Sequence, residues 1–373
     1  IGAEFGVGKD VTGRLGTAWR LPFGLGALLV GWLADKYGAK RLLVLYLLGC
    51  AATAFAAWRA ESLPVLFAAM LVMGCFASIY HPAGLALISR ETTPQTRGAA
   101  LGWHGVVGSA GIALAPLAAG VAFGAGTLSW RQYYLVLIAP AVALALLLAM
   151  FLRDDRDEDA ARVGRPVRPA PDGPSEDTAR WRLYFLLVTI GAQSGFIYAA
   201  FMHFLPRYLD QSGLTPAGMP PESFRNYLTA LVLTFAILGQ AVAGRLARPG
   251  RLEGLQSLIL LANVPCLVWV GFAGGAGRLW ASCALALVHF MTQPVYNSLI
   301  AQYVPRARRS VSYGFSNMIC FGIGALGPWY AGLLKDDRLI YGGLAGVAAA
   351  AAAMALWLRT GPVDKPAGQG RYS

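Results

Sequence analysis

The sequence predicts an all-α polytopic membrane protein, and three observations support this prediction. Of the 373 residues, 56% are hydrophobic and 13% are charged, whereas an ordinary soluble domain carries about 25% charged residues. Apolar runs close to or above the ~18 residues of a spanning helix recur along almost the whole chain. Apolar and polar residues do not alternate as they would in barrel strands, so helices are the expected spanning elements. This composition excludes a disordered chain, a nucleic-acid-binding protein whose charge lies on a folded surface, and most cytosolic enzymes.

Eleven apolar runs are expected to form spanning helices. The five runs of the first half of the chain are Gly13–Ala34, Leu42–Trp58, Pro64–Ser89, Gly98–Phe123 and Tyr133–Leu152. The six runs of the second half are Leu183–Leu205, Tyr227–Ala247, Leu255–Phe272, Leu279–Tyr303, Val311–Leu334 and Leu339–Leu358. Between the halves, residues 153–180 are rich in charge and proline, which predicts a disordered linker. The expected organisation is an N-terminal bundle (1–152), this linker, a C-terminal bundle (181–360) and a tail (361–373).

The distribution of basic residues predicts the orientation. The chain has 31 Lys and Arg against 19 Asp and Glu, a formal net charge of +12. One alternating set of loops, together with the tail, holds 21 of the basic residues, and the other set holds nine. Because basic loops favour the cytoplasm, the first set is expected to be cytoplasmic, with the C-terminus inside and Ile1 outside. That set comprises residues 35–41, 90–97, 153–182, 245–251, 306–309 and those after Leu358.

The cysteines give no sign of metal or redox chemistry. All five lie inside apolar runs, and none forms a C-x-x-C pair or a Cys/His cluster with ligand spacing. We interpret them as small hydrophobic residues. Neither a metal nor a cofactor is expected.

The two halves contain an internal repeat. A shift of 212 residues aligns His81–Gly120 with Gln293–Gly332 without a gap, and ten of the forty positions are identical. The identities include Pro82/Pro294, Gly102/Gly314, Pro116/Pro328 and Gly120/Gly332. Two parallel bundles joined by a long linker are therefore expected. Because Leu183–Leu205 has no counterpart in the first half, a twelfth helix is expected to precede Ile1.

A loop motif and a helix motif carry a family resemblance. Residues 31–41 read GWLADKYGAKR, which resembles the G-x-L-a-D-[RK]-x-G-[RK]-[RK] loop of the major facilitator superfamily, with Ala39 in place of a basic residue. The resemblance implies the major facilitator fold, with two six-helix bundles of which the first helix is missing. The candidate gating residues are Gly31, Asp35, Lys36, Gly38, Lys40 and Arg41.

Residues 111–120 read GIALAPLAAG and resemble the motif that the family's efflux antiporters carry in their fifth helix, with Ala115 and Ala119 in place of glycine. The segment SIYHPAGLALIS at residues 78–89 resembles the fosmidomycin-resistance-like branch. The candidate helix-packing residues are Gly111, Pro116 and Gly120, with Pro328 and Gly332 from the second copy of the repeat.

Apart from Arg14 and Arg245, which are counted with the loops at the span ends, Arg20 is the one Lys or Arg inside a predicted span, and no Asp or Glu lies inside any of them. A guanidinium at membrane depth without an acidic neighbour favours an anion-binding role. The alternative is that Arg20 extends outward to Glu4 or Asp10.

Further polar residues lie on helices that, by the resemblance, surround a central cavity. His289, Gln293 and Asn297 share one helix face, and the repeat maps Gln293 onto His81. The alternative is hydrogen bonding between helices without a substrate. With neutral-range pKa values, His81 and His289 are also candidate carriers of a coupling proton. The candidate substrate-binding residues are Arg20, His81, Gln193, Tyr198, His289, Gln293 and Asn297.

The resemblance implies a monomeric secondary transporter in the inner cell membrane, which moves a small solute by alternating access and has no enzyme chemistry. Its expected partners are that solute, the lipid bilayer and a coupling proton or ion, but not nucleic acid. Two alternatives within transport stay open, an efflux antiporter for amphipathic drugs and a small-anion carrier that uses Arg20. An integral-membrane enzyme is the least favoured reading, because no histidine has an acidic neighbour at catalytic spacing.

Overall fold

The computed structural model describes residues 1–91, 94–124, 128–152, 179–248, 250–305 and 308–360, so the predicted linker lies almost entirely outside the described residues and the predicted tail wholly so. Every element in the described ranges is a helix. The first group comprises α1 (Gly2–Phe5), α2 (Lys9–Tyr37), α3 (Ala39–Arg59), α4 (Leu63–Ala77), α5 (Tyr80–Glu91), α6 (Pro94–Gly124) and α7 (Trp130–Phe151). The second comprises α9 (Trp181–Asp210), α10 (Pro221–Leu246), α11 (Leu252–Phe272), α12 (Gly277–Phe290), α13 (Thr292–Tyr303), α14 (Arg309–Gly324), α15 (Leu326–Leu333) and α16 (Asp337–Thr360).

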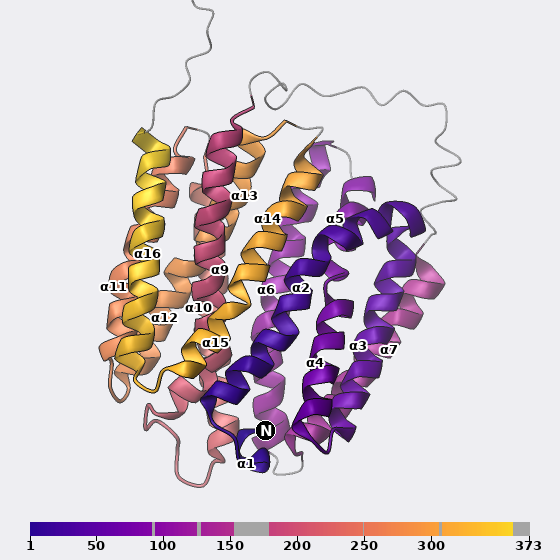
Figure 1. The fold of residues 1–373 in the computed structure, drawn as a ribbon, viewed down its shortest axis with the longest axis vertical. Coiled ribbons are helices and arrows are strands. Elements are labelled where there is room, and N and C mark those ends of the chain that lie inside the picture. The colour runs from indigo at the N-terminus through magenta and orange to yellow at the C-terminus, as the bar shows by residue number, and fades with distance from the viewer. Residues whose placement is uncertain (92–93, 125–127, 153–178, 249, 306–307, 361–373) are drawn as a thin grey trace, which may run out of the picture.

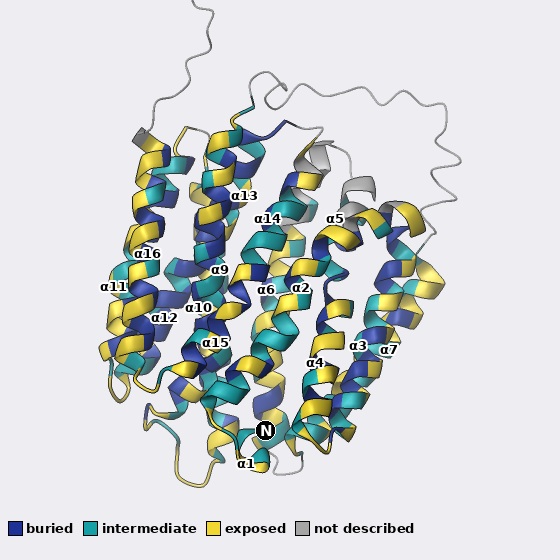
Figure 2. Ribbon diagram, viewed as in Figure 1, coloured by how far each residue is buried: buried dark blue, intermediate teal, exposed yellow. Residues whose placement is uncertain are grey.

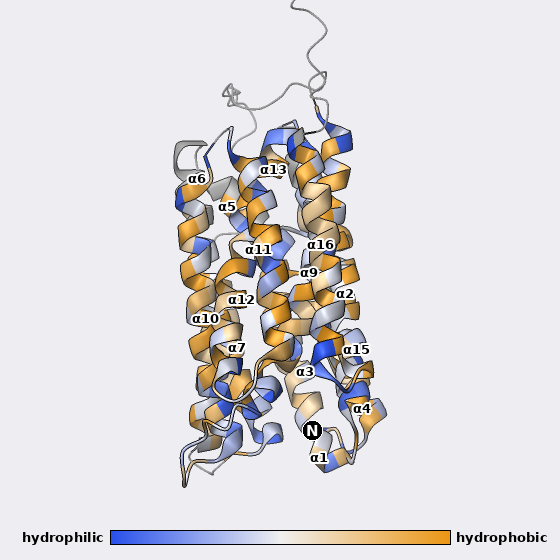
Figure 3. Cartoon of the chain, turned by 90° about the vertical axis from the view of Figure 1, so that its left-hand side faces the viewer, coloured by the Kyte–Doolittle hydropathy of each residue, from blue (hydrophilic) through white to orange (hydrophobic). Residues whose placement is uncertain are grey.

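The two groups form two bundles that lie side by side, here called the N half and the C half (Figure 1). The end of the molecule that holds α1 is called the α1 end, and the end that holds the turn between α2 and α3 is called the opposite end. Apolar residues dominate the middle of the helices, and polar residues gather at both ends (Figure 3). This distribution matches a bilayer with water on both sides.

Among the described residues, eight helices are long and apolar enough to cross a membrane. The other three predicted runs are also helical, but each departs from a simple apolar span. The run at 13–34 is the continuous helix α2, which carries Arg14 and Arg20. The runs at 279–303 and 311–334 are each divided into two shorter helices.

Proline explains these divisions. The helical pattern is interrupted at Ser78–Ile79, at Met291 and at Ala325, each three or four residues before a proline. A proline ring clashes with the carbonyl four residues earlier and removes one helix hydrogen bond. Pro82 and Pro294, which the repeat aligns, thus divide α4 from α5 and α12 from α13, and Pro328 divides α14 from α15.

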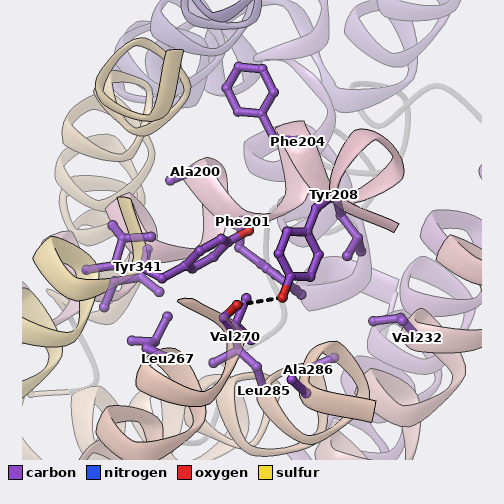
Figure 4. Close-up of a cluster of buried hydrophobic side chains, with 14 of the residues drawn as sticks. Ala200, Phe201, Phe204, Tyr208, Val232, Leu267, Val270, Leu285, Ala286 and Tyr341 are labelled. Atoms are coloured by element: carbon purple, nitrogen blue, oxygen red, sulfur yellow. Dashed lines mark hydrogen bonds between the residues drawn. The ribbon is translucent and has the colours of Figure 1, made fainter. Parts of the chain in front are cut away.

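Four hydrophobic clusters fill the halves, and buried residues line the inward faces of the helices (Figure 2). In the C half, one cluster around Phe201, Leu267 and Leu285 lies towards the α1 end, and another around Tyr184, Leu299 and Ala355 lies towards the opposite end. Figure 4 shows the first of them, in which the Tyr208 hydroxyl donates a hydrogen bond to the Val270 carbonyl at 2.5 Å. The N half has a corresponding pair of smaller clusters.

The N half packs less completely than the C half. The spanning segments of α6 and α7 have 11% and 6% of their residues buried, against 39–56% in the other six spans. In the C half, α9 packs against α14, α15 and α16, which correspond by the repeat to α6 and α7. In the N half, no helix in the described ranges packs against both α6 and α7 as α9 packs against their counterparts in the C half. A twelfth helix before Ile1 stays a prediction.

Helix α1 is held to the start of α7. The Glu4 carboxylate accepts a hydrogen bond from the Trp130 indole and pairs with Arg131 at 2.7 Å. The hydrogen bond from Arg131, followed by that from Trp130, lowers the pKa of Glu4 below its ordinary value. Glu4 is therefore committed to α7 and does not extend towards Arg20.

Candidate functional site

The halves meet through close contacts that run from the α1 end to the middle of the bundle. Gly120 of α6 packs against the start of α10, where the Ser223 hydroxyl donates to its carbonyl. Gly332, its mate in the repeat, packs against the start of α2, and a Cβ there would lie 2.7 Å from the Lys9 carbonyl oxygen. The two copies of the repeat therefore make equivalent contacts across the interface.

Helix α2 forms the other part of this interface with α14 and α15. The Thr17 hydroxyl donates to the Ala325 carbonyl at 2.7 Å. Nearer the middle, α2 and α14 touch backbone to backbone, because a Cβ at Gly24 would lie 2.4 Å from the Gly322 nitrogen. No larger side chain fits there without moving a helix.

An ion cluster joins the halves at the α1 end. The Asp337 carboxylate lies 2.8 Å from the Arg278 guanidinium and 3.9 Å from Lys9 Nζ, the only one of the three residues in the N half. The side chains of all three are 17% exposed, and Lys9 also lies over the Phe204 ring. Sequence reasoning missed this cluster because Lys9 lies 328 residues from Asp337 along the chain, 337 minus 9.

Arg20 lies between the halves and faces aromatic rings. Its guanidinium carbon is 5.4 Å from the centre of the Trp19 ring and 6.0 Å from that of Tyr198 on α9. The structure therefore brings together two of the residues that the sequence singled out. The Tyr198 ring in turn packs against Phe290 at 5.6 Å.

His81 belongs to an adjoining aromatic group. Its ring stacks on Phe321 of the C half at 5.9 Å and meets Phe23 edge-on at 5.8 Å. Phe23 also stacks on Trp19 at 5.4 Å, so this group continues into the surroundings of Arg20. Arg20, His81 and Tyr198 thus form one site between the halves, here called the central site.

The predicted stripe on one helix is divided by the break at Met291. Gln293 and Asn297 are exposed on α13, and Gln293 accepts a hydrogen bond from Gln240 at 2.8 Å. His289 is instead buried on α12, with a ring nitrogen 2.9 Å from the Asn263 Oδ1 of α11. The structure does not bring His289 to the face that carries Gln293.

Gln193 also points into the C half. Its amide nitrogen lies 3.6 Å from the Met354 sulfur of α16, and its buried oxygen has no recorded hydrogen-bond partner among the described residues. It lies on α9 with Tyr198, although its amide is directed away from the N half.

A polar connection that sequence reasoning missed crosses the interface. The Ser109 hydroxyl of α6 donates to the Gln240 oxygen, and the Gln240 amide donates to Gln293. Ser109 and Gln240 lie in predicted spans, where a polar side chain is conspicuous in the sequence. Only the packing of α6 against α10 shows that these two side chains are in contact.

The gating motif is described in part. Of Gly31 and Asp35, only the backbone is described, as part of α2. Gly38 has φ 86°, the positive value that a turn between α2 and α3 requires and that glycine adopts readily. Lys36 lies over the Trp32 ring at 5.1 Å. Lys40 and Arg41 follow in the first turn of α3.

The other packing residues are placed as follows. Gly111 faces open space, so a Cβ there would meet nothing within 4 Å. Pro116 lies inside the unbroken helix α6. Pro328 is buried, and its carbonyl oxygen would lie 2.4 Å from a Cβ at Gly13. No group of three or more His, Cys, Asp or Glu in the described ranges could hold a metal.

The position of His289 predicts that its main role is structural. His289→Ala removes the partner of a buried Asn263 oxygen, which costs about 1–3 kcal/mol of stability. We therefore expect a lower melting temperature in detergent, whereas exposed Gln293→Ala leaves it unchanged. A normal melting temperature for His289→Ala, together with a raised KM for solute, would instead assign it to binding.

Comparisons with known proteins agree with the fold. The sequence model of the Major Facilitator Superfamily matches residues 1–328. The chain is 26% identical to the 3-(3-hydroxy-phenyl)propionate transporter of Escherichia coli, over 94% of this chain and 84% of that protein. It is 38% identical to the puromycin resistance protein of Streptomyces alboniger over 41% of this chain, and the match spans only 29% of that protein. The crystal structure of a bacterial homologue of the human lysosomal transporter Spinster, inward-facing and occupied, has a TM-score of 0.69 at 15% identity and covers 96% of this chain and 89% of its own.

Proposed function

Because the chain belongs to the Major Facilitator Superfamily, we propose that it is a secondary active transporter that moves a small organic solute by alternating access. The observation that supports this most directly is the central site, where Arg20 of the N half faces Tyr198 of the C half. A solute bound there contacts both bundles. Its binding therefore depends on how the bundles are placed, which is the coupling that alternating access needs.

The interface at the α1 end is suited to opening. It depends on close backbone contacts at glycines, on hydrogen bonds that Thr17, Ser223 and His203 donate to backbone carbonyls of the other half, and on the ion cluster around Asp337. The large hydrophobic clusters lie within each half. Separation of the halves at this end thus breaks few interactions and leaves both hydrophobic interiors intact.

The relatives support a small organic solute. The Escherichia coli relative, matched over most of its length, is named for the transport of 3-(3-hydroxy-phenyl)propionate, and the Streptomyces alboniger relative is named for puromycin resistance. In this proposal the protein spans the inner membrane several times, and its C-terminus is cytoplasmic because the basic loops lie on the same side.

A disulfide across the α1 end tests the mechanism. In a variant whose five native cysteines are replaced, Thr17→Cys and Ala325→Cys introduce a pair at the hydrogen-bonded contact. Radiolabelled 3-(3-hydroxy-phenyl)propionate and puromycin serve as solutes in proteoliposomes of both orientations. We expect oxidation to abolish flux and reduction to restore it.

The matched control is a pair within one half. Ser129→Cys and Gln132→Cys replace the hydrogen-bonded residues at the start of α7, so their disulfide leaves the halves free to separate. Flux that persists after the Thr17–Ala325 pair is fully oxidised would contradict alternating access. The direction of flux down an imposed proton gradient separates uptake from efflux.

A further inference from the structure

Resting on the proposed transport function, we infer that the solute is an organic anion with a flat apolar body. Its carboxylate or sulfonate binds the Arg20 guanidinium, and its body lies against the aromatic rings of the central site. The inference depends on three observations. The acids that precede Arg20 in the chain are paired with other residues, the N–H groups of its guanidinium have no acceptor among the described residues, and both halves contribute aromatic rings around it.

The two acids that precede Arg20 in the chain, Glu4 and Asp10, have other partners. Asp10 pairs with Arg14 at 3.3 Å, and Glu4 pairs with Arg131 at 2.7 Å. Among the described residues, no carboxylate pairs with Arg20 and no hydrogen bond from its guanidinium is recorded. Arg20 lies 11 residues into α2, about 16 Å from its start, so this charge is deep in the bilayer. An unpaired charge at that depth is costly, and an anionic solute would remove the cost.

The contacts that Arg20 does make leave its donors free. Trp19 and Tyr198 offer ring faces, which attract the cation without accepting its N–H groups in hydrogen bonds. A guanidinium presents five donors in a planar fork, which matches the two oxygens of a carboxylate or sulfonate. Among the described residues, the Tyr198 hydroxyl makes no hydrogen bond, so it is a further donor that a bound anion could use.

The rings around Arg20 favour a flat apolar body over a small inorganic ion. Trp19 stacks on Phe23 at 5.4 Å, and Phe23 meets Phe321 of the C half at 5.2 Å. Aromatic groups bind best to such surfaces by stacking or edge contacts. A hydrated inorganic anion would have to lose water against these rings and would gain no ring contact.

Matched probes separate charge from shape. Benzoate, 3-phenylpropionate and naphthalene-2-sulfonate carry a ring and a negative charge, benzamide and benzylamine carry a ring without one, and acetate carries the charge without a ring. Binding to the full chain in detergent is followed by thermal shift, and uptake is measured in proteoliposomes. We expect at least one ring-bearing anion to bind and to be transported, with benzamide, benzylamine and acetate at least about tenfold weaker.

Variants test whether Arg20 is the contact. Arg20→Gln is expected to reduce the affinity for the bound anion by about 10- to 100-fold, because a charge-assisted hydrogen bond is lost. Arg20→Lys is expected to fall short of the parent, because an ammonium cannot bind two oxygens in the same plane. The control is Arg14→Gln, which removes an exposed, ion-paired charge six residues away and should leave binding unchanged.

Three results would overturn the inference. The first is equal or better binding of benzamide or benzylamine, and the second is no binding by any of the anions. The third is an Arg20→Gln variant that keeps the preference for anions over amides. These results would not by themselves contradict the proposed transport function. That function still holds if neutral or cationic solutes are transported and the Thr17–Ala325 disulfide blocks their flux.

Discussion

Replacing Gly24 with leucine is expected to abolish most transport while the protein still folds. A Cβ at this position would lie 2.4 Å from the Gly322 nitrogen and 2.6 Å from the Phe321 carbonyl carbon. Both are backbone atoms of α14, so no rotamer change can relieve the overlap. Overpacking at such a contact costs about 1–3 kcal/mol or more, which lowers the population of the joined α1 end by about 10- to 100-fold.

The measurement is solute flux in proteoliposomes together with labelling of a cysteine at position 17 by a membrane-impermeant maleimide. Labelling should rise as flux falls, because the α1 end opens. Gly244→Leu is the matched control, since nothing lies within 4 Å of a Cβ there. Normal flux by the Gly24 variant would show that the transport cycle does not need the close contact of α2 and α14.

Asp337→Asn is expected to weaken the α1-end contact by leaving two cations without their shared carboxylate. Lys9 and Arg278 both face Asp337, and all three side chains are mostly buried. Removing one member of a fully buried pair costs about 3–5 kcal/mol, and the partial exposure here reduces that figure. We expect transport to fall by about tenfold or more, since each ~1.4 kcal/mol changes an equilibrium tenfold.

A second change identifies the cause of that loss. Adding Lys9→Met to Asp337→Asn removes the cation contributed by the N half and should restore part of the flux. Asp336→Asn is the neighbouring control, because Asp336 is exposed and only caps the backbone of Arg338. A double variant no better than Asp337→Asn alone would place the effect within the C half, where Arg278 is the remaining partner.

The helical architecture could be predicted from the sequence because each span is a local pattern. The run at 133–152, for example, appears as α7 with nearly the same limits. The breaks were not predicted, although Pro82 and Pro294 were recognised as a repeated pair. Proline inside an apolar run is compatible with either a bend or a break, and Pro116 shows the third outcome, an unbroken helix.

The candidate site was predictable only where a single residue was informative. Arg20 is conspicuous as a charge at membrane depth, and its surroundings agree with an unneutralised guanidinium. The prediction that His289 and Gln293 share one helix face rests on helical periodicity alone. The break at Met291 interrupts that periodicity and places the two residues on different helices. Contacts such as Lys9–Asp337 depend on how two bundles approach each other, which no local pattern encodes.

The paired clusters within each half have a mechanical consequence. In the C half, Phe290 at the end of α12 belongs to one cluster and Val295 of α13 belongs to the other. The break at Met291 therefore lies between the two clusters. In the N half, Met70 of α4 belongs to one of the corresponding clusters, and Ile79, at the break, belongs to the other. The divided helices are thus the compliant members of each bundle, whereas unbroken helices such as α9 and α16 run through both clusters of the C half and are the stiff ones. A tilt at one face of the membrane can therefore be taken up at the mid-depth breaks while the unbroken helices keep the two ends of the bundle in register.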